Sequence, residues 1–288
     1  MSTLSADLQL GFVHLTISNL GRSLAFYQQS LGFQVHRREG DTAYLGAGGP
    51  DLLVLTERTG AVRYRHVTGL YHFAILVPSR LELAQVIKRV AETRTPVQGA
   101  SDHLFSEALY LPDPDGNGIE IYRDRPRDQW PRDAQGNIQG DSLPLDIEDV
   151  LSELAQQAGP WTGLHPKTRL GHMHLHVHNI PETLTFYRDV LGFELMLDWN
   201  SALFVSAGGY HHHIGLNIWG VQGASPAPPE SIGLRYFTIH LPSQAEADAV
   251  VVRARAAKAR VEEHPAGQLV RDPAQNGLVF TTIKPHTP

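Results

Sequence analysis

The second half of this 288-residue chain repeats the first half, and this repeat constrains the fold more than any other feature. Three motifs recur 160 positions later: Asn19-Leu20 with Asn179-Ile180, Phe26-Tyr27 with Phe186-Tyr187, and Leu31-Gly32-Phe33 with Leu191-Gly192-Phe193. A second pair of copies runs over residues 71–79 and 235–243, and each copy ends in Pro-Ser. Both of these copies are followed later by matching turns: Asp113-Pro114 with Asn117-Gly118, and Asp272-Pro273 with Asn276-Gly277. The chain is therefore predicted to contain four units in an A-B-A-B order.

Each unit shows the same plan of one strand, one helix and further short strands. Alternating apolar residues predict a strand over 13–17, and the residues at 22–31 have a helical pattern. Short strands are expected after it, at 42–45 and 52–55. In the B units the predicted helices are 81–90 and 245–257, and the last strands are 118–122 and 277–283. The prediction is an α+β fold of four βαβββ units.

The repeat also predicts the domain organisation. We expect one domain over residues 10–125 and a second over 169–285, each built from two units. The segment between them, 126–168, is rich in Pro, Asp, Arg and Gln, and we interpret it as a connection that partly packs. It contains one predicted helix, at 146–157, with acidic residues at its N-terminus.

Composition excludes several classes of protein. The net charge of −6 and the pI near 6.2 provide no basic surface for nucleic acid. The chain has no cysteine, so disulfides and thiolate metal sites are ruled out. No apolar run approaches the roughly 18 residues of a membrane span, and residues 1–9 lack the pattern of a signal peptide. We expect a soluble cytoplasmic protein that forms homo-oligomers, with no nucleic-acid or membrane partner.

One run in the first half carries most of the chemistry. It contains His72, His103, Tyr110 and Glu120, and the turn Asp113-Pro114-Asp115-Gly116 precedes the carboxylate and sets the register of its strand. Two histidines and one carboxylate that leave coordination positions open suit an Fe(II) centre that activates oxygen. The run supplies only part of such a centre. Further histidines are concentrated in the second half, at His172, His174 and His176 and at His211, His212 and His213.

The repeat and its motifs resemble the vicinal oxygen chelate superfamily. That superfamily includes glyoxalase I, fosfomycin-resistance proteins, bleomycin-binding proteins and extradiol ring-cleavage dioxygenases. Residues 103–120 resemble the extradiol signature of His, Leu-Tyr, Asp-Pro, Gly and Glu, although Ser101 departs from its usual residue types. Residues 207–216 form a second landmark of the catechol 2,3-dioxygenase group. The resemblance covers nearly the whole chain and implies two domains with cupped mixed and antiparallel sheets.

The resemblance also implies where the metal ligands lie. In the superfamily a ligand tends to lie fourteen residues before the Phe of Phe-Tyr, which corresponds here to His172 and Phe12. The matching positions in the B units are His72 and Tyr236, and those of the last strands are Glu120 and Val279. The expected set is therefore His72, His172 and Glu120, between the second and third units. An alternative keeps the site in the first half and replaces His172 by His14, which lies two residues after Phe12 on the same strand face.

Roles for the remaining residues follow from the same resemblance. The context Gly209-Tyr210-His211-His212 matches that of the extradiol catalytic histidine, so His212 is the expected proton-transfer residue. His103 and Tyr110 are expected to hydrogen-bond a substrate oxygen and to assist ring opening. We expect His211 and His213 on a strand face, and His174 or His176 as pocket-lining or supporting residues. A buried Glu120 between two isoleucines would be costly without a cationic partner.

The implied activity is extradiol cleavage of catechol by O2 to 2-hydroxymuconate semialdehyde at Fe(II), with Mn(II) as an alternative metal. A dioxygenase for hydroquinone or for substituted or bicyclic catechols is the main alternative. A glyoxalase-type isomerase needs four protein ligands, and residues 211–219 offer no acid for the fourth. A protein that only sequesters a ligand would not need the metal-binding triad. The expected partners are a small aromatic diol and O2.

Overall fold

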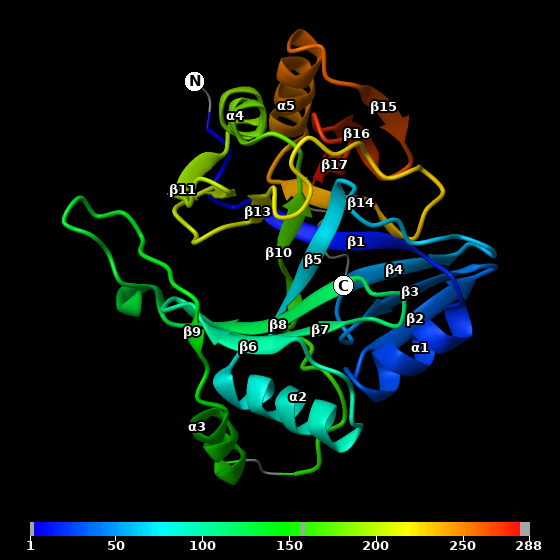
Figure 1. The fold of residues 1–288 in the computed structure, drawn as a ribbon, viewed down its shortest axis with the longest axis vertical. Helices are drawn as coiled ribbons and strands as arrows, with labels where there is room; N and C mark the ends of the chain where they lie inside the picture. Colours follow the sequence, from blue (N-terminus) through cyan, green and yellow to red (C-terminus); the bar gives the residue numbers. More distant parts are fainter. Residues whose placement is uncertain (1–2, 157–158, 283–288) are drawn as a thin grey trace.

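Four βαβββ units follow one another along the chain in the computed structural model, which describes residues 3–156 and 159–282 (Figure 1). The first unit comprises β1 (Gln9–Ile17), α1 (Leu20–Gln29), β2 (Gln34–Glu39), β3 (Thr42–Gly46) and β4 (Asp51–Glu57). The second comprises β5 (Gly69–Leu76), α2 (Arg80–Glu92), β6 (Gly99–Asp102), β7 (Ser106–Pro112) and β8 (Gly118–Asp124). The third comprises β10 (Arg169–His176), α4 (Ile180–Leu184) with a π-helical continuation (Thr185–Leu191), β11 (Glu194–Asp198), β12 (Ala202–Ser206) and β13 (Ile214–Asn217). The fourth comprises β14 (Gly233–Leu241), α5 (Gln244–Ala256), β15 (Val261–His264), β16 (Gly267–Arg271) and β17 (Gly277–Thr282). The predicted α+β repeat is confirmed.

The helix of each βαβββ unit begins at a side-chain cap that belongs to a repeated motif. Asn19 accepts a hydrogen bond from the backbone N–H of Arg22, and Asn179 does the same for Glu182. In the B units the Ser of Pro-Ser takes this role, as Ser79 before α2 and Ser243 before α5. Because such caps satisfy free N–H groups, the helices start one or two residues before the predicted positions.

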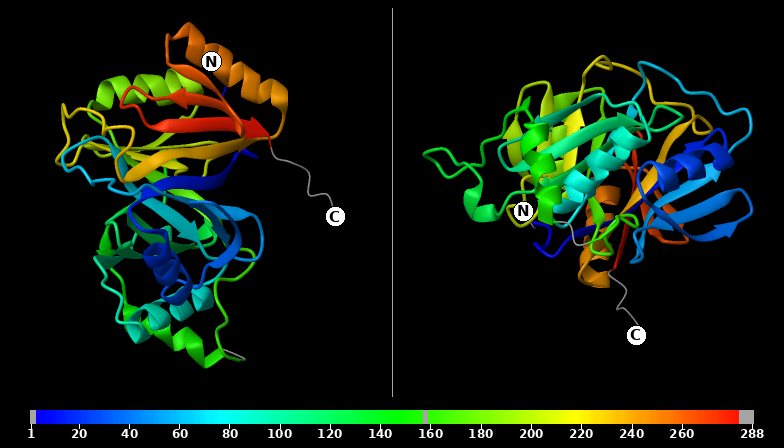
Figure 2. Two further views of the ribbon diagram at one scale, coloured as in Figure 1. Left: turned by 90° about the vertical axis from the view of Figure 1, so that its right-hand side faces the viewer. Right: turned by 90° about the horizontal axis from the view of Figure 1, so that it is seen from below.

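The four units form two sheets, and each sheet combines units from opposite halves of the chain. The eight-stranded sheet has the order β15-β16-β17-β14-β1-β4-β3-β2, which joins the fourth unit to the first. The nine-stranded sheet has the order β11-β12-β13-β10-β5-β8-β7-β6-β9, which joins the third unit to the second. The antiparallel pairs β1–β14 and β5–β10 make these connections, as the neighbouring blue and orange strands in Figure 2 show for the first pair. The predicted domain limits of 10–125 and 169–285 thus separate the two repeats of the sequence, but each sheet contains strands from both of these ranges.

The hydrophobic core lies between the central strands of the two sheets. Strand β1 contacts β10, and β14 contacts β5. Because side chains alternate along a strand, Phe73 and Met173 enter this core and are fully buried. Their neighbours His72 and His172 therefore point to the opposite, concave face of the nine-stranded sheet.

The connecting segment packs against the second unit. Strand β9 (Leu143–Pro144) extends the sheet beyond β6, and α3 (Ile147–Ser152) packs on α2. The predicted helix at 146–157 begins after its N-cap, Asp146, and continues as the 3-10 turn Glu153–Gln156; Gln157 lies outside the described residues. A short 3-10 turn, Arg127–Gln129, leads to Trp130, which packs with Phe105 and Tyr210 beside the histidine-rich loop.

Candidate metal centre and active site

Three side chains meet on the concave face of the nine-stranded sheet: His72 from β5, Glu120 from β8 and His172 from β10. Their candidate ligand atoms all lie within 4.8 Å of one another. Nε2 of His72 and Nε2 of His172 each lie 3.0 Å from the same oxygen of Glu120, Oε2. All three side chains are buried. The register explains their convergence, because Ala74 of β5 pairs with Glu120 on one side and with His172 on the other.

The chemistry of this cluster fits a divalent metal. Nε2 of His72 forms no hydrogen bond of acceptable geometry within the described residues, although it is buried and aimed at the carboxylate. Burial would raise the pKa of Glu120, but the neighbouring His172 and His72 outweigh this and hold that pKa well below its usual range. Burial lowers the pKa of His72 despite the nearby Glu120. Two imidazole nitrogens beside a carboxylate form a donor set suited to metals such as Fe and Mn.

The alternative ligand His14 lies on the other sheet. Its Nε2 hydrogen-bonds Oγ1 of Thr56 at 2.8 Å, and its ring lies against Tyr236. Burial, with smaller effects of Arg235 and His264, lowers the pKa of His14 to about 3. The structure therefore brings His172 rather than His14 to His72 and Glu120.

A fourth ligand position is absent from this cluster. Across the antiparallel pair β5–β10, His72 lies opposite His174, and Ala74 lies opposite His172. A pseudo-twofold axis between the two strands therefore exchanges His72 with His172 and Ala74 with His174. Glu120 lies opposite Ala74, and the residue opposite His174 on β13 is Gly215. A Cβ at Gly215 would lie 2.9 Å from the ring of His174. The position equivalent to Glu120 thus has no side chain and little room for one.

His212 lies beside the three-residue cluster. Its ring lies 4.1 Å from the ring of His172, centroid to centroid, and it lines the cavity. Burial, aided by the positive charge that His172 can carry, lowers the pKa of His212 well below its usual value. The expectation that His211 and His213 occupy a strand face is wrong, because all three histidines lie in the loop before β13. The two glycines before them, Gly208 and Gly209, adopt positive φ and turn the chain into this loop.

His103 and Tyr110 lie on the opposite side of the cluster. Nε2 of His103 lies 2.6 Å from the hydroxyl of Tyr110, and Nδ1 lies 2.7 Å from the carbonyl oxygen of Asp141. A carbonyl only accepts, so His103 donates from Nδ1, and Nε2 accepts the phenolic proton of Tyr110. Burial, followed by the negative charge of Glu120, raises the pKa of Tyr110 well above 10. The connecting segment therefore orients an expected catalytic residue through Asp141.

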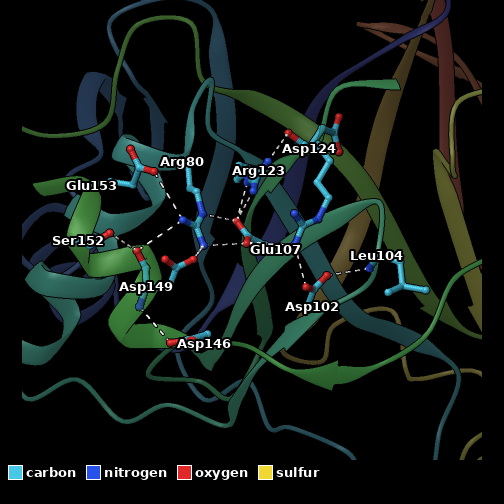
Figure 3. Close-up of polar contacts among 11 residues, drawn as sticks. Arg80, Asp102, Leu104, Glu107, Arg123, Asp124, Asp146, Asp149, Ser152 and Glu153 are labelled. Atoms are coloured by element: carbon cyan, nitrogen blue, oxygen red, sulfur yellow. Dashed lines mark hydrogen bonds and ion pairs between the residues drawn. The ribbon is translucent and has the colours of Figure 1, made fainter. Parts of the chain in front are cut away.

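An ion-pair network centred on the buried Glu107 supports the loop that carries His103 (Figure 3). Glu107 on β7 binds Arg80 and Arg123, and Arg125 reaches both Glu107 and Asp102. Asp102 in turn accepts a hydrogen bond of 2.8 Å from the N–H of Leu104, whose φ is +70°. Such a backbone conformation is costly for leucine, so these contacts hold the loop in an otherwise unfavourable shape.

Some residues around the site were not predicted from the sequence. Asn217 lies between two pocket histidines: its Nδ2 is 3.0 Å from Nε2 of His174, and its Oδ1 is 2.9 Å from Nδ1 of His176. Asp124 lies 2.9 Å from Nε2 of His211. Strand periodicity could have indicated Asp124, because residues 120, 122 and 124 of β8 share one face.

The cluster forms part of the wall of a cavity of about 1360 Å³. His72, Glu120, His172 and His212 line it, together with aromatic side chains. The aromatic residues are Tyr64, Tyr71, Phe105, Tyr110, Trp199, Phe204, Trp219 and Tyr236. A cavity that combines polar groups at one place with aromatic walls suits a small aromatic ligand.

Comparison with known proteins identifies the family. The model described as Glyoxalase/Bleomycin resistance protein/Dioxygenase superfamily matches residues 9–121 and again residues 169–280. The chain belongs to this superfamily. Membership confirms the resemblance seen in the repeat motifs. Among the described residues, no helix is long and apolar enough to cross a bilayer.

Relatives within the superfamily include a near full-length match. Over 288 residues the chain is 46% identical to the Catechol-2,3-dioxygenase of Bacillus subtilis (strain 168), covering 98% of this chain and 100% of that protein. A solved structure of a Bacillus subtilis protein proposed to be a dioxygenase superposes with a TM-score of 0.64 at 14% identity, covering 99% of this chain and 87% of the other. Glyoxalase I from Zea mays gives 0.57 at 15%, covering 96% and 93%. At such identities the two structures show a shared fold.

Proposed function

We propose that this protein is an extradiol dioxygenase that cleaves catechol with O2 to 2-hydroxymuconate semialdehyde at an Fe(II) centre. The observation that carries the proposal is the buried His72–Glu120–His172 cluster, which has three protein ligands and opens onto an aromatic cavity. The 46% identity to a Catechol-2,3-dioxygenase over the whole chain supports the same reaction. Three ligands leave coordination positions for the substrate oxygens and for O2.

In this proposal the cluster residues hold the metal. Two imidazole nitrogens and one carboxylate oxygen, from His72, His172 and Glu120, would bind it. When bound, Fe(II) supplies the redox chemistry that couples the diol to O2 and favours ionisation of the diol. The ring bond beside the diol breaks, and each carbon of that bond receives one oxygen atom, so both atoms of O2 enter the product.

The surrounding residues move and hold protons. His212 accepts a proton from a substrate hydroxyl, since its lowered pKa keeps the ring neutral before reaction. Tyr110 retains its proton because its pKa is raised, and since that proton is directed to His103, the phenolic oxygen is left to accept a hydrogen bond from a substrate hydroxyl. His103 orients that phenol through the 2.6 Å contact between Nε2 and the hydroxyl.

Gly215 argues against a glyoxalase-type isomerase. That reaction calls for a fourth ligand, and the symmetry-related position has no side chain. Hydroquinone and substituted or bicyclic catechols remain alternative substrates for the same centre.

The decisive experiment measures oxygen uptake and product absorbance with the iron-loaded protein on a panel of catechols, hydroquinone and a hemithioacetal. We expect one O2 consumed per catechol and a yellow semialdehyde. Isomerisation of the hemithioacetal without oxygen uptake would refute the proposal.

Metal analysis of the purified protein distinguishes Fe(II) from Mn(II). Fractionation and light scattering test the proposed cytoplasmic location and homo-oligomeric state.

A further inference from the structure

A row of three hydrogen-bonded side chains leads away from the cavity through His212. Nδ1 of His212 lies 2.8 Å from Nδ1 of His211, and Nε2 of His211 lies 2.9 Å from Oδ1 of Asp124. His211 is fully buried, whereas the carboxylate of Asp124 is 21% exposed. Asp124 lies at the end of β8, the strand that also carries Glu120.

The chemistry of the three groups determines the order of their protons. An ionised carboxylate only accepts hydrogen bonds, so His211 donates to Asp124 from Nε2. In a neutral His211 the other nitrogen, Nδ1, then carries a lone pair. The short contact between the two Nδ1 atoms requires one N–H, and it must therefore come from His212. The remaining nitrogen of His212, Nε2, is left with its lone pair.

The position of the two rings shows where this lone pair points. His212 lines the cavity and His211 does not, so the Nδ1 edge of His212 faces away from the cavity and its Nε2 edge faces toward it. A neutral histidine with the opposite proton order would present an N–H to the substrate and could not act as a base.

We propose that Asp124 and His211 are positioning residues that hold His212 as the Nδ1–H tautomer, with Nε2 as the base that faces the substrate. This inference rests on the proposed function of His212. When Nε2 takes the proton of a substrate hydroxyl, His212 becomes a cation, and the negative charge of Asp124 stabilises it through His211. The proton returns from Nε2 to an oxygen of the ring-opened product, so His212 ends the cycle neutral.

A purely structural role for His211 is the competing explanation. Its ring stacks on Phe105 at 4.5 Å with an interplanar angle of 15°, and it also packs against Trp130 and Tyr210. Phenylalanine at this position would keep the packing and remove both nitrogens. His211→Phe therefore separates the two explanations.

Asp124 offers a second variant with a matched control. The hydroxyl of Tyr210 donates to Oδ2 of Asp124 at 3.0 Å, on the side away from His211. In Asp124→Asn this hydroxyl favours the amide oxygen and turns the amide N–H toward His211. The donor order is then reversed, and Nε2 of His212 becomes protonated. Tyr210→Phe removes the other bond to the same carboxylate and leaves the contact with His211 intact.

The experiment compares iron-loaded wild type with Asp124→Asn, Asp124→Glu, His211→Phe and Tyr210→Phe. We expect kcat for catechol to fall by roughly 10²–10⁴ in Asp124→Asn and His211→Phe, the range of a general acid–base contribution, with KM and iron content unchanged. Asp124→Glu should recover part of kcat, and Tyr210→Phe should stay close to wild type. If Asp124→Asn behaves like Tyr210→Phe, or if it loses kcat only together with its iron, the proposal is overturned.

A second measurement does not depend on turnover. Long-range proton–nitrogen NMR of the protein loaded with diamagnetic Zn(II) reports which ring nitrogen of His212 is protonated, with His212→Gln to assign the signals. We expect the proton on Nδ1 in the wild type and on Nε2 in Asp124→Asn. A wild-type His212 protonated on Nε2 overturns the inference even if catechol is cleaved. The expected tautomer in a protein that ignores every catechol would count against the proposed function alone.

Discussion

The hydroxyl of Tyr27 donates a hydrogen bond of 3.0 Å to Oδ2 of Asp113, and both side chains are buried. The second half repeats this contact, since Tyr187 donates to Asp272 at 3.0 Å. These bonds join the Phe-Tyr motif of an A unit to the Asp-Pro turn of the following B unit. The sheets pair the first unit with the fourth and the second with the third. The four units are therefore connected both within and across the halves, which supports the proposed two-unit domains without making their sheets independent.

Removing one of these phenol hydroxyls should destabilise the fold without affecting the metal. In Tyr27→Phe the buried Asp113 loses a hydrogen-bond donor, and we expect a loss of about 1–3 kcal/mol in the free energy of unfolding. Tyr187→Phe should show a similar loss, and the more exposed Tyr44→Phe should stay within about 0.5 kcal/mol of wild type. Urea denaturation provides the measurement. A change in Tyr27→Phe no larger than in Tyr44→Phe would contradict the prediction.

Metal binding should depend on His172 and not on His14. Loss of a hydrogen bond that supports a metal ligand lowers metal affinity by about 10–100-fold. We expect Glu120→Ala and His172→Ala, which remove a ligand itself, to lower the affinity by at least this much. His14→Gln retains a polar contact to Thr56 and should bind metal like wild type. Competition titration with a chelator, combined with metal analysis, tests all three. Full metal content in a folded Glu120→Ala protein, or loss of metal in His14→Gln alone, would rule out the proposed ligand set.

Replacement of His212 should separate metal binding from catalysis. We expect His212→Ala to keep its iron and to lose roughly 10²–10⁴ in turnover, because the substrate loses its proton acceptor. The neighbouring His213 hydrogen-bonds Oγ of Ser206 and does not line the cavity, so His213→Gln is the matched control. Oxygen uptake at saturating catechol is the measurement. Near-normal turnover in His212→Ala would exclude the proposed role.

Tyr110 and His103 should act as one unit. We expect Tyr110→Phe to lower kcat by about 10–100-fold, the equivalent of a strong hydrogen bond of 1.5–3 kcal/mol. His103→Gln should cause a similar loss, and the double variant should be no worse than the more affected single variant. The raised pKa of Tyr110 means that the phenol keeps its proton as the pH rises from 7 to 9. Losses that multiply in the double variant would show that the two residues act independently.

Acid should weaken the fold through His14. Because burial lowers its pKa from 6.5 to about 3, the folded state keeps His14 neutral while the unfolded chain takes up a proton below pH 6.5. The contribution of His14 to stability is complete above pH 6.5 and is lost as the pH falls toward 3. Between pH 6.5 and 5 this amounts to about 2 kcal/mol. We expect His14→Gln to lose less stability over this interval than wild type in urea titrations. Parallel pH profiles for the two proteins would contradict the prediction.

The sequence alone predicted the repeat and the order of elements, and the resemblance to the superfamily singled out His72, His172 and Glu120, with His14 as an alternative, as candidate ligands. The repeat and its elements depend on local signals: alternating apolar residues in strands, and Asn and Ser caps before helices. The observed helix ends lie only one or two residues from the predicted ones, because capping acts on nearest neighbours along the chain.

Only the tertiary structure decided which units share a sheet and which histidines meet. The pairing of β5 with β10 joins residues about a hundred positions apart, and it excludes His14 by placing β1 in the other sheet. The same pairing leaves Gly215 where a fourth ligand would stand, and the fold brings Asp124 to His211. No local pattern encodes these contacts. They follow from burying the apolar faces of both sheets in one core, and that burial depends on the whole chain at once.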